Sequence, residues 1–307
     1  IMQDVPSDAS RRARQQVAQA DVKVTAAAVD ISRLEARVAA ATAWLQAFYA
    51  EQRVDVLLTL ADDAATLELA TTASLGSGAG KADVALSARL QAARLQDRID
   101  DARFEAAASR AELERWIGPL GADRLGPAPP VFLIDANALR EHLEHHVELV
   151  GSSAALARAQ AEIEQARAGR ESDWSWSLMY GRRDPAFGDM ISLGVRFKLP
   201  LFQSDRQAPT IEARRADLKR VGLERDAVLR EHRAMLEARL AEHGQLSARL
   251  VRAREIVLPL AHQQETVAQA AHAAGTLDLA SLFAMRLEAK EAELDRLARF
   301  AGCERVE

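Results

Sequence analysis

The chain has 307 residues, of which 49% are hydrophobic, 28% are charged and only 5% are aromatic. This composition is typical of long helices and coiled coils rather than of a dense globular core. A net charge of −5, with no basic stretch clear of neighbouring acids, argues against a nucleic-acid partner. The single cysteine, Cys303, excludes a disulfide or a multi-cysteine metal site within these residues.

The first predicted element is one helix over residues 7–72, because this stretch has no glycine or internal proline and its apolar residues recur at helical spacing. Its length would be roughly 100 Å. Two seven-residue rows form the seam of a left-handed coiled coil: Val17, Val24, Ile31, Val38 and Leu45, and Ala20, Ala27, Leu34, Ala41 and Phe48. The rows break after Phe48, which predicts a stutter there.

Further long helices follow. A glycine-rich turn at 75–80 separates the first helix from a second over 82–116, so the two form an antiparallel hairpin. Residues 118–135, with four prolines, form an irregular connector before a helix over 136–168. A third long helix is predicted over 209–273 and a fourth after Gly275. No apolar run reaches the ~18 residues of a transmembrane helix, so any membrane contact is expected from strands.

Two segments, 174–181 and 190–199, alternate large apolar with small or polar residues, which predicts a β-hairpin with a turn at 182–188. Strands of about ten residues with one apolar face can span a membrane. The expected lipid-facing residues are Trp174, Trp176, Leu178, Tyr180, Ile191, Leu193, Val195 and Phe197, and the expected lumen-facing residues are Ser192, Arg196 and Lys198. A soluble two-stranded sheet packed on helices is the alternative.

The second half of the chain repeats the first. Residues before the two helix tips match at an offset of 200, and residues after the tips match at an offset of 195, which indicates a tandem duplication. Val5-Pro6 matches Leu199-Pro200, so residues 1–6 are expected to be the stub of a strand equivalent to 195–200. Because no signal segment precedes them and the last helix stops early, we interpret the chain as a fragment truncated at both ends.

Three features of the sequence resemble the TolC-like outer-membrane efflux family. They are the hairpin with its 199–202 exit (Leu-Pro-Leu-Phe), the paired tips 80–84 (Gly-Lys-Ala-Asp-Val) and 275–279 (Gly-Thr-Leu-Asp-Leu), and the duplicated layout. The nearest branch is the CzcC-like heavy-metal efflux components. The resemblance implies a mainly α fold with a small transmembrane β part. Long antiparallel coiled-coil hairpins would form a trimeric α-barrel, and four strands per protomer would join a shared twelve-stranded β-barrel.

The resemblance also implies a domain layout: a strand stub at 1–6, a first helical hairpin at 7–117, an equatorial connector and helix at 118–170, a transmembrane β-hairpin at 171–202 and a truncated second helical hairpin at 203–307. The protein would be a homotrimer in the outer membrane of a Gram-negative bacterium, in contact with its lipid and extending into the periplasm. It would work with a periplasmic adaptor (membrane fusion protein) and an inner-membrane RND-type pump as a passive duct, with heavy-metal cations as the expected cargo. No cofactor and no enzyme activity are expected. A soluble periplasmic coiled-coil scaffold and a metal-buffering protein are the alternatives.

Candidate sites are few. His142, His145 and His146 stand at helical i, i+3, i+4 spacing and either bind zinc or copper or form an exposed polar turn. Asp62 and Asp63 either line a selective acidic ring or lie on a solvated helix face.

The helix tips are the expected adaptor-docking site. Glycine allows the turn and aspartate can cap the returning helix. The residues concerned are Gly80, Asp83 and Val84 at the first tip, and Gly275, Asp278, Leu279 and Leu282 at the second.

Overall fold

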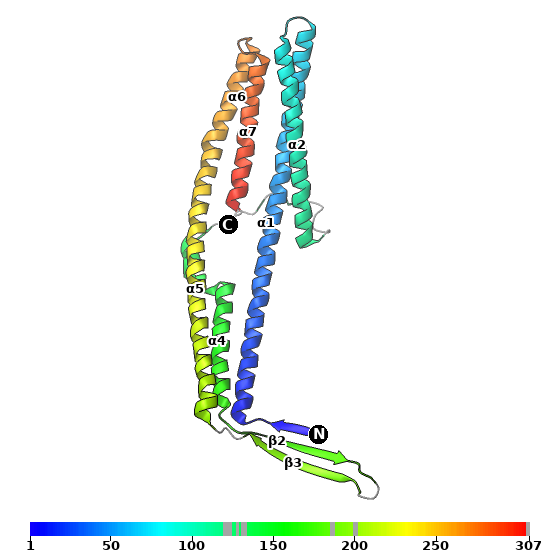
Figure 1. Cartoon of the computed structure of the whole chain (residues 1–307). Coiled ribbons are helices and arrows are strands. Elements are labelled where there is room, and N and C mark those ends of the chain that lie inside the picture. The colour runs from blue at the N-terminus through cyan, green and yellow to red at the C-terminus, as the bar shows by residue number, and fades with distance from the viewer. Residues whose placement is uncertain (119–124, 127–128, 130–133, 185–187, 199–201, 305–307) are drawn as a thin grey trace. The chain divides into compact units, whose positions relative to one another are not determined.

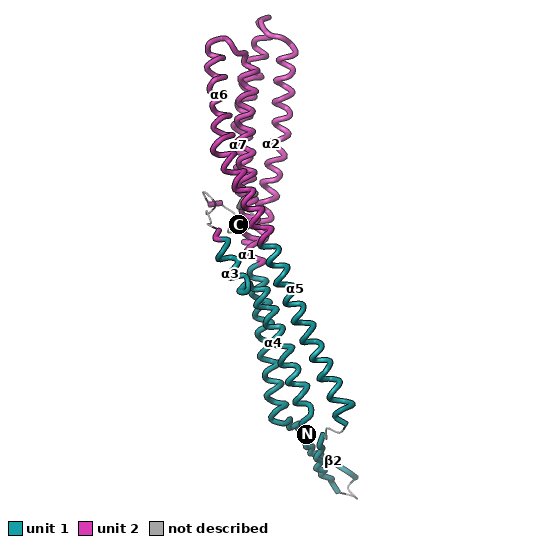
Figure 2. Tube along the Cα trace, turned by 90° about the vertical axis from the view of Figure 1, so that its left-hand side faces the viewer, with its two compact units in different colours: residues 1–34, 136–236 teal, residues 35–135, 237–307 magenta. Residues whose placement is uncertain are grey.

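The computed structural model describes residues 1–118, 125–126, 129, 134–184, 188–198 and 202–304. Its elements follow the chain as a short strand, two long helices, a short helix, a 3₁₀ turn, a medium-length helix, a hairpin and three further helices (Figure 1). Two compact units result: residues 1–34 with 136–236, and residues 35–135 with 237–307 (Figure 2). Each unit therefore draws on both halves of the chain.

The first unit holds the sheet β1 (Met2–Val5), β2 (Asp173–Gly181) and β3 (Met190–Lys198), which are antiparallel in the order β1-β2-β3. Both strands of the predicted hairpin are thus confirmed, and the expected stub at 1–6 forms β1. Ser7 caps the following helix, since its hydroxyl accepts a hydrogen bond from the Ser10 N–H at 3.1 Å. The Ser7 N–H donates to Asp173 at 2.8 Å, which ties this helix start to β2.

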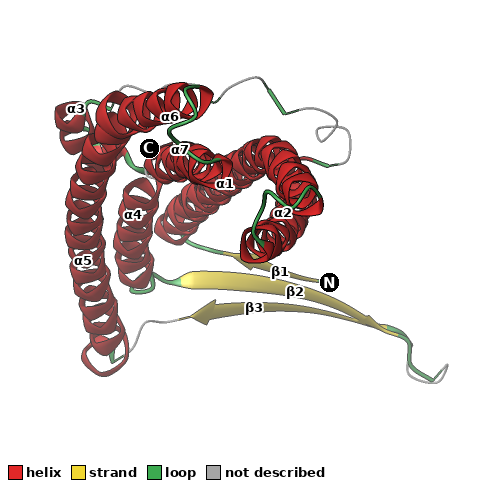
Figure 3. Ribbon diagram, turned by 90° about the horizontal axis from the view of Figure 1, so that it is seen from above, coloured by secondary structure: helices red, strands yellow, loops and turns green. Residues whose placement is uncertain are grey.

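Three long helices contribute to the first unit: α1 (Asp8–Gly76) up to residue 34, α4 (Val147–Ala168), and α5 (Gln203–Arg252) up to residue 236. Figure 3 shows α4 between the other two. Gly151 of α4 faces α1, since a Cβ there would lie in ordinary van der Waals contact, 3.4 Å from Ile31 and 3.6 Å from Ala27. The Arg158–Asp21 ion pair, at 2.7 Å, bridges the same two helices.

The second unit combines the remainder of α1 with α2 (Ala82–Ile117), α6 (Leu258–Ala273) and α7 (Leu279–Glu304). Its core is formed by Leu57, Leu60, Ala64, Leu67, Ala88, Leu95, Ile99, Ala102 and Phe283. Small residues between the large ones allow the helices to approach closely. An ion pair between Arg286 of α7 and Asp63 of α1, at 2.9 Å, flanks the core. Asp63 is therefore half-buried and paired, while Asp62 is exposed.

The predicted seam of α1 is only partly correct. Ala20 and Ala27 are buried as expected, but Val38 and Ala41 are exposed, so the buried stripe changes phase before Phe48 and not after it. Beyond the change, Ala43, Ala50, Leu57, Ala64 and Thr71 form one buried seven-residue row. The stripe shifts because α1 packs in one unit up to residue 34 and in the other beyond it.

Two predicted helices are interrupted. The expected helix over 136–168 consists of α3 (Ala136–Glu141), the 3₁₀ turn η2 (Leu143–His145) and α4. The expected helix over 209–273 begins earlier, at Gln203, and contains the π turn η3 (Ala253–Val257) before α6. Pro259, just inside α6, has no N–H to donate to the preceding turn, which accounts for the π turn.

Among the described residues, no helix is long and apolar enough to cross a membrane. Parts of the predicted connector 118–135 and of the turn 182–188, together with the exit residues 199–201, lie outside the described residues.

Candidate functional site

The strand register places the predicted apolar residues on one face of the hairpin. Residues opposite each other in an antiparallel pair point to the same side. The four pairs are Trp174 with Phe197, Trp176 with Val195, Leu178 with Leu193, and Tyr180 with Ile191. All eight predicted residues therefore form a single surface, which we call the apolar sheet face.

This apolar sheet face is open rather than packed. Seven of its residues are exposed, among them Leu193 at 72% and Val195 at 54%, while Trp176 is half-buried. On the opposite face Ser175 is buried, although it is polar. A soluble sheet packed on helices would bury its apolar side, whereas this sheet leaves its apolar side exposed.

The polar face carries charge. Ser175 pairs with Arg196, Asp173 pairs with Lys198, and a hollow of about 480 Å³ beside them is also lined by Arg14. The predicted Ser192, Arg196 and Lys198 share this face, but so do Met179 and Met190, which the alternation in the sequence did not assign to it.

The two helix tips of the second unit meet in one groove. Gly80, Val84, Asp278 and Leu279, four of the predicted tip residues, line a cavity of about 260 Å³ together with Lys81. Residues about 195 positions apart in the sequence are thus neighbours in the structure. We call this cavity the tip groove.

The tips turn by different means. At the second tip Gly275 has φ 74° and Asp278 caps α7 by accepting a hydrogen bond from the Ser281 N–H at 2.7 Å, as predicted. At the first tip Gly78 has the positive φ, and Gly80 is instead required because a Cβ there would lie 2.8 Å from the Leu75 nitrogen. The predicted cap by Asp83 is wrong: the N-cap of α2 is Lys81, without a side-chain cap.

The structure also differs from the prediction that Leu282 belongs to the adaptor-docking site. Its side chain is only 7% exposed, so it packs inside the second unit and is not available for docking. Leu279 is half-buried and packs against the core of that unit. Of the predicted tip residues, Asp83 is exposed and Val84 is half-buried in the groove.

The predicted histidine cluster is divided by the 3₁₀ turn. His142 and His145 stack edge to face on each other, with ring centroids 5.8 Å apart. His146 instead faces His232 of α5, with ring centroids 4.8 Å apart. His232 was missed, because a histidine on a separate helix, 86 positions along the chain, carries no spacing signal that connects it to residue 146.

Two hydrogen bonds from Ser281 hold the pKa of Asp278 below its usual value of 3.8. The bond from the Ser281 side chain has the larger effect, and the bond from the Ser281 backbone N–H has the smaller one. The carboxylate form is therefore the one that caps α7.

The fold is that of outer-membrane channel proteins. No family model and no curated protein matches the chain. The solved CmeC outer membrane channel of Campylobacter jejuni aligns with 99% of this chain and 67% of its own, at 11% identity and a TM-score of 0.79. A membrane protein from Pseudomonas aeruginosa aligns with 99% of this chain and 73% of its own, at 13% identity and a TM-score of 0.75. The outer membrane protein VceC of Vibrio cholerae aligns with 99% of this chain and 77% of its own, at 14% identity and a TM-score of 0.72.

Proposed function

We propose that this chain is a protomer of an outer-membrane efflux duct, located in the outer membrane of a Gram-negative bacterium and extending into the periplasm. The observation that carries the proposal is the apolar sheet face, which is continuous, exposed and backed by a charged face. Membrane strands have this arrangement, since lipid is on the outside and water on the inside. The fold shared with solved outer-membrane channels supports the same assignment.

In this proposal the parts of the chain have separate roles. Residues 1–6 and 171–202 contribute strands to a shared twelve-stranded β-barrel. The helical hairpins 7–117 and 203–307, related by tandem duplication, form a periplasmic α-barrel, and 118–170 form the equatorial region. Ser192, Arg196 and Lys198 face the water-filled lumen. The protein conducts passively and performs no chemistry.

Self-association into a homotrimer is supported by apolar residues on α2. Leu86, Leu90 and Phe104 are exposed, and their separations of 4 and 14 residues place them along one side of the helix. The three side chains are not a continuous stripe, because Asp97 lies on the same side between Leu90 and Phe104. Large exposed apolar residues grouped on one side of a helix are nevertheless available for contact with another chain. Closed rings of identical chains bury such surfaces.

The tip groove is the proposed contact for a periplasmic adaptor, which in turn joins an RND-type pump. Gly80, Val84, Asp278 and Leu279 line it, and the exposed Asp83 lies beside Val84 on the first turn of α2. A partner helix hairpin with an apolar tip would fit a groove of this kind. Heavy-metal cations are the proposed cargo, on the basis of the resemblance to CzcC-like components.

Membrane insertion can be tested by tryptophan fluorescence. With Trp44 and Trp116 changed to Phe, only the two strand tryptophans emit, and lipids brominated on their acyl chains should quench them. In the matched control, Trp174 and Trp176 are changed to Phe and the other two tryptophans are kept. Equal quenching in both proteins, or none in the first, would contradict the proposal.

Adaptor docking can be tested by crosslinking in intact cells. In a Cys303→Ser background, a photoreactive label on Asp83→Cys should capture the adaptor. The same label on Arg182→Cys, in the hairpin turn, should not. Capture from both positions, or from neither, would remove the docking role of the tip groove.

A further inference from the structure

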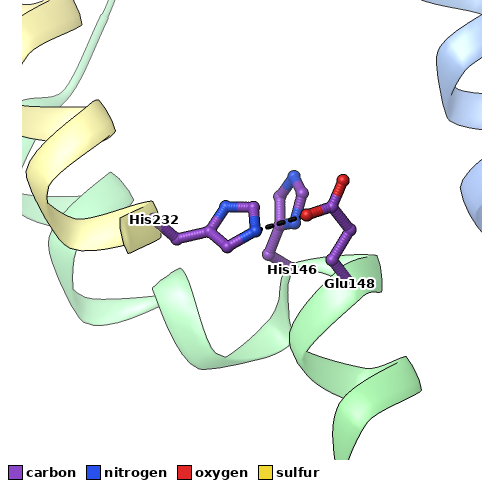
Figure 4. Close-up of side chains that lie close together, drawn as sticks. All are labelled: His146, Glu148 and His232. Atoms are coloured by element: carbon purple, nitrogen blue, oxygen red, sulfur yellow. Dashed lines mark hydrogen bonds and ion pairs between the residues drawn. The ribbon is translucent and has the colours of Figure 1, made fainter. Parts of the chain in front are cut away.

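We propose that His146, Glu148 and His232 form a binding site for a divalent first-row transition cation, with Zn²⁺ as the representative ion. Figure 4 shows the three side chains converging from two elements of the first unit. His146 immediately precedes α4, Glu148 lies in the first turn of α4, and His232 lies on α5. One potential ligand atom from each lies within 4.8 Å of the other two. The inference does not depend on the channel assignment.

The ligand set matches the chemistry of such an ion. Two imidazoles and one carboxylate hold zinc in known protein sites, with further positions left for water or another ligand. Tetrahedral zinc with bonds of about 2.0–2.1 Å needs ligand atoms about 3.3 Å apart, so side-chain movements of about 1 Å complete the site. Mg²⁺ and Ca²⁺ prefer oxygen ligands alone and are not expected to bind.

One ligand atom lacks any other role. The Nδ1 atom of His146 is buried and has no hydrogen-bond partner. Buried polar atoms are normally satisfied, since an unsatisfied one costs about 1–3 kcal/mol. His146 also does not use its side chain to cap α4. A cation at the trio would give this nitrogen the partner that the protein chain does not provide.

The surroundings make the site enclosed but reachable. The side chain of His232 is only 13% exposed and already contacts the Glu148 carboxylate, so these two ligands are held together before an ion arrives. Glu148 is 45% exposed, which leaves a path from solvent. A bound ion would tie the start of α4 to α5.

The 3₁₀ turn explains why the site differs from the one the sequence indicates. In a continuous helix, His142 and His146 would share a face at i, i+4 spacing. The break at Leu143–His145 instead leaves His142 beside His145 and places His146 against α5. The chain thereby offers its own controls, two neighbouring histidines that lie outside the trio.

Isothermal titration of the metal-free full chain with ZnCl₂ tests the site. We expect one ion per chain, and His146→Gln and His232→Gln should each weaken binding at least about tenfold. His142→Gln and His145→Gln should leave the affinity within about twofold. MgCl₂ should give no binding heat. Each variant is compared with the parent chain by circular dichroism without metal, and Glu148→Gln provides a third, independent loss of a ligand.

X-ray absorption of the zinc-loaded chain adds a readout of the ligands themselves. Nitrogen and oxygen neighbours at about 2.0–2.1 Å are expected, whereas a sulfur neighbour at about 2.3 Å would place the ion on Cys303. The proposal is overturned by such a sulfur signal, by the absence of zinc binding, by retained affinity in the folded His146→Gln and His232→Gln chains, or by loss of binding in His142→Gln.

Discussion

A positive charge on the apolar sheet face should change the free energy of folding in water only slightly, but should raise the free energy of membrane insertion strongly. Leu193 and Val195 lie on this face and are 72% and 54% exposed, so replacing either with arginine removes few contacts within the chain. In water, substitutions at such exposed positions usually change the free energy of unfolding by no more than about ±0.5 kcal/mol. At the middle of a bilayer an outward arginine costs about 2–4 kcal/mol.

The difference is large enough to measure. A cost of about 2–4 kcal/mol lowers the inserted fraction by about 30- to 700-fold, since every 1.4 kcal/mol is a factor of ten. In the proposed trimer, three independent copies would raise this cost to about 6–12 kcal/mol per assembly. Ser192→Arg is the matched control, because Ser192 pairs with Met179 on the opposite face.

The assay is flotation with phospholipid vesicles, followed by electrophoresis with and without heating to detect assembled protein. We expect Leu193→Arg and Val195→Arg to lose both flotation and the heat-sensitive band, and Ser192→Arg to keep both. Circular dichroism in water should be the same for all three. Equal loss in the three variants would refute the assignment of the two faces.

Three further outcomes are expected. Leu57→Ala should lower the free energy of unfolding by about 2–5 kcal/mol in urea titrations, because Leu57 is fully buried, whereas its neighbour Leu58, 37% exposed, should tolerate alanine with a change below about 1 kcal/mol. Gly275→Ala should lower the free energy of unfolding by about 1–2 kcal/mol, because the backbone at Gly275 has a positive φ. Gly76→Ala is the control and should not lower it, because Gly76 has open space around it and no positive φ. Equal melting temperatures of the two variants would show that the turn relaxes. Because the pKa of Asp278 is lowered in the folded chain, its cap should stabilise α7 above about pH 4 and weaken as the pH falls through that lowered pKa, and Asp278→Asn should remove this dependence from acid unfolding curves.

Local patterns in the sequence predicted most of the elements. The alternation over 174–181 and 190–199 defined both strands of the hairpin and the residues of the apolar face, because the side-chain period of a strand is two. The absence of glycine and proline over 7–72 predicted α1, and the glycines of the tips marked where the helices turn. The repeated tips and the hairpin resemble those of an outer-membrane channel family, and the structure has the fold of such channels.

The irregular points of the helices were not predicted. Residues 136–168 carry helical spacing throughout, but the chain breaks at Leu143–His145, and Pro259 produces a π turn rather than an end. The phase change in α1 depends on which partner helices lie beside each section. Propensity is a weak signal where tertiary packing decides between nearby backbone conformations.

The sequence by itself determined the helices, the strands and which strand residues share a face, because each follows from side chains only a few positions apart. Only the tertiary structure decided that Leu282 is buried, that the two tips line one groove and that His146 faces His232 rather than His142. Those features join residues 86 or more positions apart, or depend on the helix beside them, and contacts of that kind leave no periodic signal along the chain.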